Sequence, residues 1–217
     1  MISKKQAVQK LLNQEIVSYV RQSIIPKYTA FDDAHNLDHV NKVIQNSMEI
    51  AADYDVDGNK VYVIAAYHDV GLEKGPKDHE KYSASFLLAD TRLSEWFSRD
   101  ELTLMAGAIE DHRASNGHEP RSIYGKIVSE ADRDIDYTTV LVRTAQYGLK
   151  YFPDLNIEDQ FNRCYEHICE KYGEGGYLKL WLDTEKNRRS LGEIRRMLTC
   201  KEEFKADFER IFRELTK

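Results

Sequence analysis

The chain has 217 residues, of which 41% are hydrophobic and 31% are charged, and its formal net charge is −6. This composition excludes a disordered chain, and the acidic balance argues against binding to long nucleic acids, which requires a basic surface. The longest wholly apolar run covers residues 61–67 and is far shorter than the roughly 20 residues of a membrane span.

Nearly every segment of the chain has the hydrophobic periodicity of an amphipathic helix. Residues 38–54 carry apolar side chains every three to four positions, and residues 60–69 are apolar on every face, which predicts a buried central helix. Two more helices are predicted over 99–113 and 122–134. Alternating strand patterns are missing, so we expect an all-α fold.

Prolines and glycines divide these helical stretches, and three further stretches follow Pro153. We expect a single domain over residues 1–217, with its functional core at about residues 30–150. Residues 1–29 and the C-terminal helical extension 151–217 are expected to pack around this helical bundle.

The N-terminal segment and the cysteines indicate the compartment. The first residues have no apolar stretch of the kind found in a signal peptide. The three cysteines form no CxxC pair, which fits a reducing environment better than a disulfide framework. We therefore expect a cytoplasmic protein; its oligomeric state stays open.

Two histidines and two aspartates are candidate metal ligands. His68 and Asp69 end the most apolar helix, where a buried charge needs compensation and the helix terminus favours a cation. His39 lies beside the apolar stripe of the preceding helix, and Asp132 follows Val128 by four positions on a core-facing stripe. Imidazoles and carboxylates together suit a divalent metal. Each histidine taken alone is more often a hydrogen-bonded core residue.

These residues resemble the HD superfamily of metal-dependent phosphohydrolases. The resemblance rests on three segments in order, HNLDHV, AAYHDVG and EADRDID, and covers roughly residues 30–140. It implies an all-α fold in which His39, His68, Asp69 and Asp132 bind one metal. The tail, including YGEGGYLKLW, is similar to uncharacterised bacterial HD-domain proteins and implies no substrate.

The resemblance also indicates a second metal. Some HD proteins hold a second ion with two extra histidines, and the aspartate of the His-Asp pair bridges the ions. By resemblance, His79 and His112 fall at these places. Alternatively, His112 is a core histidine and His79 only begins a helix, or both face the substrate phosphate. One or two divalent ions per chain (Mn, Fe, Zn, Ni, Co or Mg) are therefore expected.

Three residues are candidates for substrate binding. Lys77 and Arg113 would form a local basic rim if His79 and His112 face the site, and the planar fork of Arg113 suits phosphate. Ordinary solvated charge is the alternative. His35, four residues before His39, would orient substrate or support His39, unless it is a cap or loop histidine.

The function that follows is hydrolysis of a nucleotide or another small phosphate ester through a metal-activated water, which Asp69 would hold or deprotonate. Neither a nucleic-acid polymer nor a membrane is an expected partner. Leu72 stands where several HD enzymes have a polar catalytic residue, and the Gly-Tyr-Pro signature of cyclic-dinucleotide phosphodiesterases is missing. The alternatives are a di-iron oxygenase on a small polyol or phosphonate, and a non-catalytic nucleotide or metal sensor.

Overall fold

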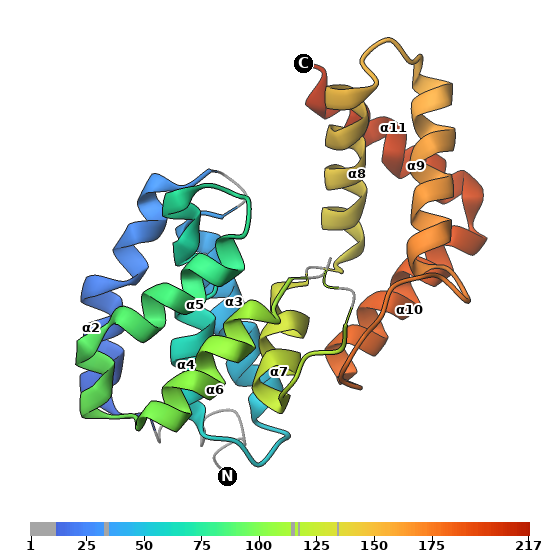
Figure 1. Cartoon of the computed structure of the whole chain (residues 1–217). Helices are drawn as coiled ribbons and strands as arrows, with labels where there is room; N and C mark the ends of the chain where they lie inside the picture. The colour runs from blue at the N-terminus through green and yellow to red at the C-terminus, as the bar shows by residue number, and fades with distance from the viewer. Residues whose placement is uncertain (1–11, 33–34, 114–115, 117, 134) are drawn as a thin grey trace. The chain divides into compact units, whose positions relative to one another are not determined.

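The computed structural model describes residues 12–217 except 33–34, 114–115, 117 and 134. The described residues form helices and no strand, so the predicted all-α fold is confirmed (Figure 1). The chain divides into two compact units, an N-terminal unit Met1–Arg133 and a C-terminal unit Asp134–Lys217. Each unit is described by itself.

The N-terminal unit consists of six described α-helices joined by short 3₁₀ helices. The α-helices are α2 (Gln14–Ser23), α3 (Leu37–Ala51), α4 (Gly58–Tyr67), α5 (His79–Ala89), α6 (Arg99–Glu110) and α7 (Ile123–Asp132). The 3₁₀ helices are η1 (Ile25–Ala30), η2 (Val70–Lys74) and η3 (Thr91–Glu95). Polar side chains accept hydrogen bonds from backbone N–H groups at most of the α-helix starts, which satisfies donors that have no partner within the helix. These capping residues are Asn13, Asn36, Asp57, Ser98 and Ser122.

Helix α4 is the core of the N-terminal unit. All side chains from Val61 to Tyr67 are buried, and the helix packs against α2, α3, α5, α6 and α7. Burial of each large aliphatic side chain contributes roughly 1.5–3 kcal/mol relative to exposure, so an all-apolar helix is most stable in the middle of the bundle. The predicted buried central helix is confirmed, and its end delivers His68 and Asp69 to the interior.

The C-terminal unit contains α8 (Tyr137–Tyr151), α9 (Ile157–Tyr172), α10 (Glu185–Thr199) and α11 (Lys201–Leu215). Its core is built largely from aliphatic and aromatic side chains, among them Phe161, Phe204 and Phe208. Gly148 lets α8 and α9 approach closely, because a Cβ atom there would lie 2.2 Å from Gln160 Oε1. The three helical stretches predicted after Pro153 are α9, α10 and α11.

The division between the units differs from the expected core of residues 30–150. Helix α8 falls inside that expected core, yet it packs against α9, α10 and α11 in the C-terminal unit. The reason is its own buried face, which includes Val140, Leu141 and Ala145 and joins the apolar core of the C-terminal unit. The N-terminal unit therefore ends at Arg133, and a single folding domain over 1–217 stays a prediction.

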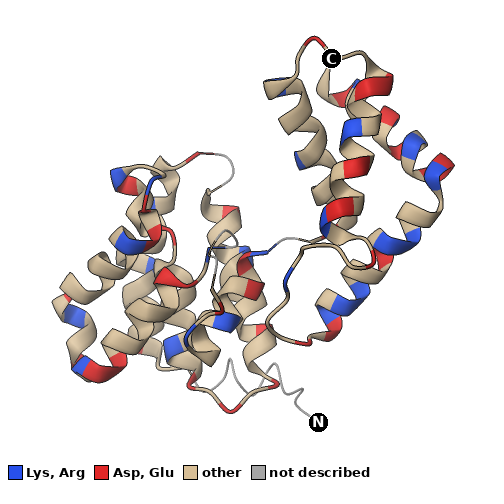
Figure 2. Ribbon diagram, turned by 45° about the vertical axis from the view of Figure 1, so that its right-hand side comes forward, with Lys and Arg blue, Asp and Glu red and all other residues tan. Residues whose placement is uncertain are grey.

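The charged residues lie mostly on the outer faces of the helices. Figure 2 shows acidic and basic residues interspersed along the helices of each unit. Among the described helices, none combines the length and the apolarity needed to cross a bilayer.

Candidate metal centre

Helices α3, α4 and α7 supply the four residues of the predicted first metal site. Asn36 caps α3 by accepting from the backbone N–H groups of Asp38 and His39, which places His39 in the first turn of the helix. His68 is the C-terminal cap of α4, and Asp69 follows it. Asp132 is the last residue of α7. The site thus lies where three helix ends meet.

His79 reaches the same place because η2 turns the chain back onto α5. Gly71 permits this turn: a Cβ atom there would lie 2.1 Å from the carbonyl oxygen of His79 and 2.5 Å from the backbone nitrogen of Ser83. Asp78, directly before α5, has a φ of 56° in the left-handed region, which aspartate tolerates better than most residues. Helix α5 therefore begins with its His79 side chain turned inward.

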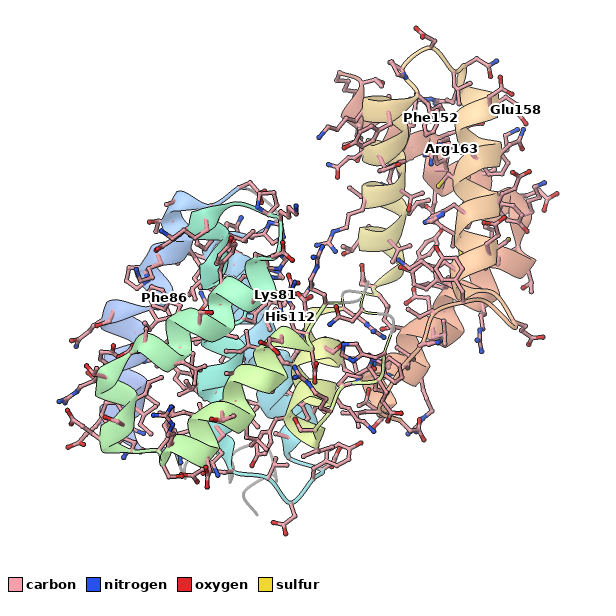
Figure 3. All side chains as sticks on the ribbon, in the orientation of Figure 1. Lys81, Phe86, His112, Phe152, Glu158 and Arg163 are labelled. Carbon is pink, nitrogen blue, oxygen red and sulfur yellow. The ribbon has the colours of Figure 1, made fainter. Side chains whose placement is uncertain are left out.

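His112 lies just beyond the end of α6. The sequence predicted that the helix extends to residue 113, but α6 ends at Glu110 and Asp111 is its cap. Asp111 is only 2% exposed, and its carboxylate accepts from the backbone N–H and the guanidinium of Arg121. That pairing draws the chain out of the helix, while His112 stays 2% exposed and points into the unit. Figure 3 labels His112 at this end of α6, next to α5, which carries Lys81.

Six side chains converge as two groups that share Asp69. His39, His68 and Asp69 form the first triad, with His68 Nε2 3.0 Å and His39 Nε2 3.4 Å from Asp69 Oδ2. Asp132 Oδ1 borders this triad, 3.4 Å from His39 Nε2 and 3.9 Å from His68 Nε2.

Asp69, His79 and His112 form the second triad. His79 Nε2 lies 3.1 Å and His112 Nε2 lies 3.4 Å from Asp69 Oδ1. Each oxygen of the Asp69 carboxylate therefore faces one pair of imidazoles, which is the arrangement of a carboxylate that bridges two ions.

Backbone carbonyls determine which ring nitrogen of three of these histidines carries the proton. Each Nδ1 donates to the carbonyl oxygen three residues earlier, at 2.7–3.0 Å. Because a carbonyl oxygen only accepts, the neutral ring must keep its hydrogen on Nδ1 and present a lone pair on Nε2. The pairs are His68 with Ala65, His79 with Pro76, and His112 with Ile109.

The donor set fits metal cations. His39 Nε2 lies 3.1 Å from His68 Nε2, and His79 Nε2 lies 3.4 Å from His112 Nε2, so the imidazole nitrogens of each triad gather in one place beside the carboxylate. Asp69 Oδ1 is buried without a well-directed hydrogen bond, although two imidazole nitrogens lie within ion-pair distance. A buried carboxylate oxygen that faces two imidazole nitrogens without a hydrogen bond is available as a metal ligand. A positive ion in each triad would be attracted by the imidazole nitrogens and the carboxylate oxygen that gather there.

The pKa shifts of these side chains also indicate that the site favours positive charge. Burial lowers the pKa of His68, but the Asp69 and Asp132 carboxylates outweigh it and raise that pKa to about 9. Burial likewise acts to lower the pKa of His79, and contact with Asp69 raises it, while Arg113 opposes the rise. Burial would raise the pKa of Asp69, yet the imidazoles around it hold that pKa well below its usual range.

Residues 36–134 match the family model of the HD domain. The chain contains an HD domain. Among solved structures, the crystal structure of a predicted HD superfamily hydrolase from an uncultured Thermotogales bacterium is similar, with a TM-score of 0.54 and 22% sequence identity. The match covers 90% of this chain and 92% of that chain, and at this identity it shows a shared fold. A search of curated proteins finds no match.

The three predicted substrate-binding residues lie differently around the candidate metal centre. His35 is closest to the first triad: its ring lies 5.8 Å from that of His39, and its Nδ1 lies 2.7 Å from Asp32 Oδ1. Arg113 is paired with Glu80 at 3.3 Å. Lys77 is exposed in the turn before α5. The structure thus brings His35 and Arg113 next to residues of the candidate metal centre, and it leaves Lys77 on the surface of the turn.

Two further residues contact the candidate metal centre and were not predicted from the sequence. The Tyr28 hydroxyl donates to the carbonyl oxygen of Ala66 at 3.0 Å and accepts from the backbone N–H of Asp69 at 3.2 Å. Tyr28 is fully buried, and burial raises its pKa well above the usual value, so the hydroxyl keeps its proton. Glu80, only 7% exposed, holds Arg113. The adjacency of Glu80 to His79 was the available signal; Tyr28, 41 positions before Asp69, offered none.

Proposed function

We propose that this HD domain is a metal-dependent phosphohydrolase that holds two divalent ions, with the Asp69 carboxylate between them. The observation that carries the proposal is the placement of one Asp69 oxygen in each triad, opposite two imidazole Nε2 atoms. Such a pair of ions clamps the attacking and leaving oxygens in phosphoryl transfer. The HD domain match and the fold shared with a predicted HD superfamily hydrolase support a hydrolase.

The residues of the site divide the work between them. When bound, divalent ions lower the pKa of water and polarise phosphoryl oxygens. The carbonyl-bound Nδ1 atoms orient His68, His79 and His112, so these rings need no rearrangement before they bind metal. The Asp69 side chain is only 4% exposed; it would be the shared ligand of the two ions and would hold or deprotonate the water that they activate.

Asp132 offers the more accessible carboxylate of the centre. Its side chain is 23% exposed, against 4% for Asp69, so water reaches it more easily. Its Oδ1 faces His39 and His68, and the same carboxylate can take a proton from water that enters the first triad.

The substrate class that we propose is a nucleotide or another small phosphate ester. Arg113 stands directly after His112 and supplies a guanidinium suited to phosphoryl oxygens. The protein has a net charge of −6, so local cations of this kind, rather than a basic surface, would attract the anionic substrate.

The test is metal analysis of protein purified without oxygen, paired with a phosphate-release screen over small esters. We expect two divalent ions per chain and release of phosphate. His79→Ala and His112→Ala should each retain one ion and lose more than about tenfold in activity, because the second clamp is gone. His118→Ala, an exposed histidine outside the triads, is the matched control and should keep two ions.

Three outcomes would replace this proposal. A wild-type protein that never exceeds one ion per chain would contradict the two-ion centre. Two irons with a paramagnetic signature, together with oxygen consumption and no phosphate release, would favour an oxygenase on the same ligand set. Tight nucleotide binding without turnover on the whole panel would favour a sensor.

A further inference from the structure

The two histidines of the second triad are each followed by a charged residue, and those two residues pair with each other. Glu80 follows His79 at the start of α5, and Arg113 follows His112 after α6. Arg113 Nη1 donates to Glu80 Oε2 over 3.3 Å. The contact therefore ties together the two chain segments that carry the histidines of this triad.

Glu80 is buried although it is a carboxylate at a helix start. Its side chain is 9% exposed, whereas that of Arg113 is 37% exposed. The helix dipole stabilises an acidic residue in the first turn of a helix, but it does so for an exposed side chain too, so it gives no reason for burial. Desolvation of a carboxylate costs free energy, and an apolar side chain of similar volume at a buried position is often at least as stable. The helix start alone thus does not account for a buried Glu80.

The partner that Glu80 serves is Arg113 rather than His79. His79 Nδ1 already donates to the carbonyl oxygen of Pro76 at 3.0 Å. Glu80 Oε2 lies 3.8 Å from that nitrogen, which is too far for a hydrogen bond. Loss of the Glu80 carboxylate would therefore leave the orientation of the His79 ring to Pro76 and would release Arg113.

Arg113 has the chemistry and the place to contact a phosphorylated ligand. A guanidinium has five N–H donors in a fixed planar fork, and the contact to Glu80 goes through Nη1. A guanidinium anchored at one end loses less conformational freedom when it binds an anion than a mobile one does.

We propose that Glu80 is a positioning residue that holds the Arg113 guanidinium beside the second triad, in the orientation in which Arg113 binds a phosphoryl oxygen. The inference rests on the proposed function, because it places a phosphorylated ligand at the metal centre. Glu80 itself touches neither the metal nor the substrate, and its effect passes through Arg113.

The experiment is a double-mutant cycle on the metal-loaded full chain, with inorganic phosphate as the probe in titration calorimetry. Arg113→Gln should weaken phosphate binding by about tenfold or more, because a charge-assisted hydrogen bond is lost. Glu80→Gln should weaken it by a similar factor, and the double variant should be no weaker than Arg113→Gln. Metal content should stay at the wild-type level in all three.

Two further variants keep the result interpretable. Glu95→Gln removes the carboxylate of the exposed Arg92–Glu95 pair and should bind phosphate like the wild type. Glu80→Asp keeps the buried charge but shortens its reach, so it should also weaken phosphate binding even if Glu80→Gln does not fold.

The inference is wrong if the effects of Glu80→Gln and Arg113→Gln are additive, or if the Glu80 variants bind phosphate like the wild type. It is also wrong if wild-type protein with its metal does not bind phosphate. Coupled variants in a protein that hydrolyses no ester would overturn the proposed hydrolysis and leave the Glu80 role standing. If the protein hydrolyses esters but the effects of the two substitutions on phosphate binding are additive, the proposed hydrolysis stands and the Glu80 role is wrong.

Discussion

The two units differ in what they bury. Among the described residues, the buried acidic side chains all lie in the N-terminal unit: Asp69, Glu80, Asp111 and Glu130. Among its described residues, the C-terminal unit buries three polar side chains, and none of them is charged: Gln160, Thr184 and Asn187. Its core is otherwise apolar and rich in phenylalanine.

This difference supports the N-terminal unit as the place of the proposed chemistry. A buried charge lowers stability unless a partner compensates it, so a core optimised only for packing has few of them. Asp111 and Glu130 have arginine partners, Arg121 and Arg133. The first pair joins residues ten positions apart, whereas Glu130 and Arg133 lie three positions apart at the end of α7. Asp69 instead faces four imidazoles, which is an arrangement for binding cations rather than for packing.

The largest effect is expected for Asp69→Ala, which removes the carboxylate shared by the two triads. We expect loss of both ions and a fall in phosphate release of at least about a thousandfold, because metal charge stabilisation is worth several kcal/mol. Metal analysis and the phosphate assay measure both effects. Asp53→Ala, on an exposed aspartate, is the control. If Asp69→Ala keeps its metal and its activity, the buried Asp69 carboxylate does not serve metal binding, and the proposed difference between the two units is wrong.

An intermediate effect is expected for Tyr28→Phe. The variant leaves the carbonyl oxygen of Ala66 and the backbone N–H of Asp69 without their hydroxyl partner. Unfolding free energy should fall by about 1–3 kcal/mol, and metal affinity by about tenfold. Denaturant titration and metal competition measure these changes. Tyr177→Phe, at a 60% exposed tyrosine, should change neither; an unchanged metal affinity in Tyr28→Phe would mean that Asp69 needs no such support.

The smallest effect is expected for Ile168→Val in the C-terminal unit, which tests whether that unit contributes only packing. Ile168 is fully buried, and Ile168→Val removes one methylene group from the apolar core. Stability should fall by about 1 kcal/mol, while metal content and turnover stay unchanged. Thermal unfolding and metal analysis test this. If the variant loses metal, packing in the C-terminal unit also supports the metal centre.

Several features of the fold and the site follow from local patterns. The apolar run before His68 predicted the central helix, and the periodicity of residues 99–113 and 122–134 predicted α6 and α7 with errors of two or three residues at their ends. The end of α6 was misplaced because Arg121, eight residues after the predicted end, draws Asp111 out of the helix. Helix α8 lies within the expected core of residues 30–150 and packs in the C-terminal unit, because packing partners decide which unit a helix joins.

The amino-acid sequence by itself determined the helical class, the buried helix that ends in His68-Asp69, and the set of possible ligands, because each depends on neighbours within a few positions. Only the tertiary structure decided that His79 and His112 meet Asp69 Oδ1 while His39 and His68 meet Oδ2. It also decided that Glu80 holds Arg113 and that Tyr28 holds the backbone of Asp69. The physical reason is sequence distance: the contacts of Tyr28 with Asp69 and of Glu80 with Arg113 span 41 and 33 positions. Such contacts depend on how the helices pack, and no local periodicity encodes them.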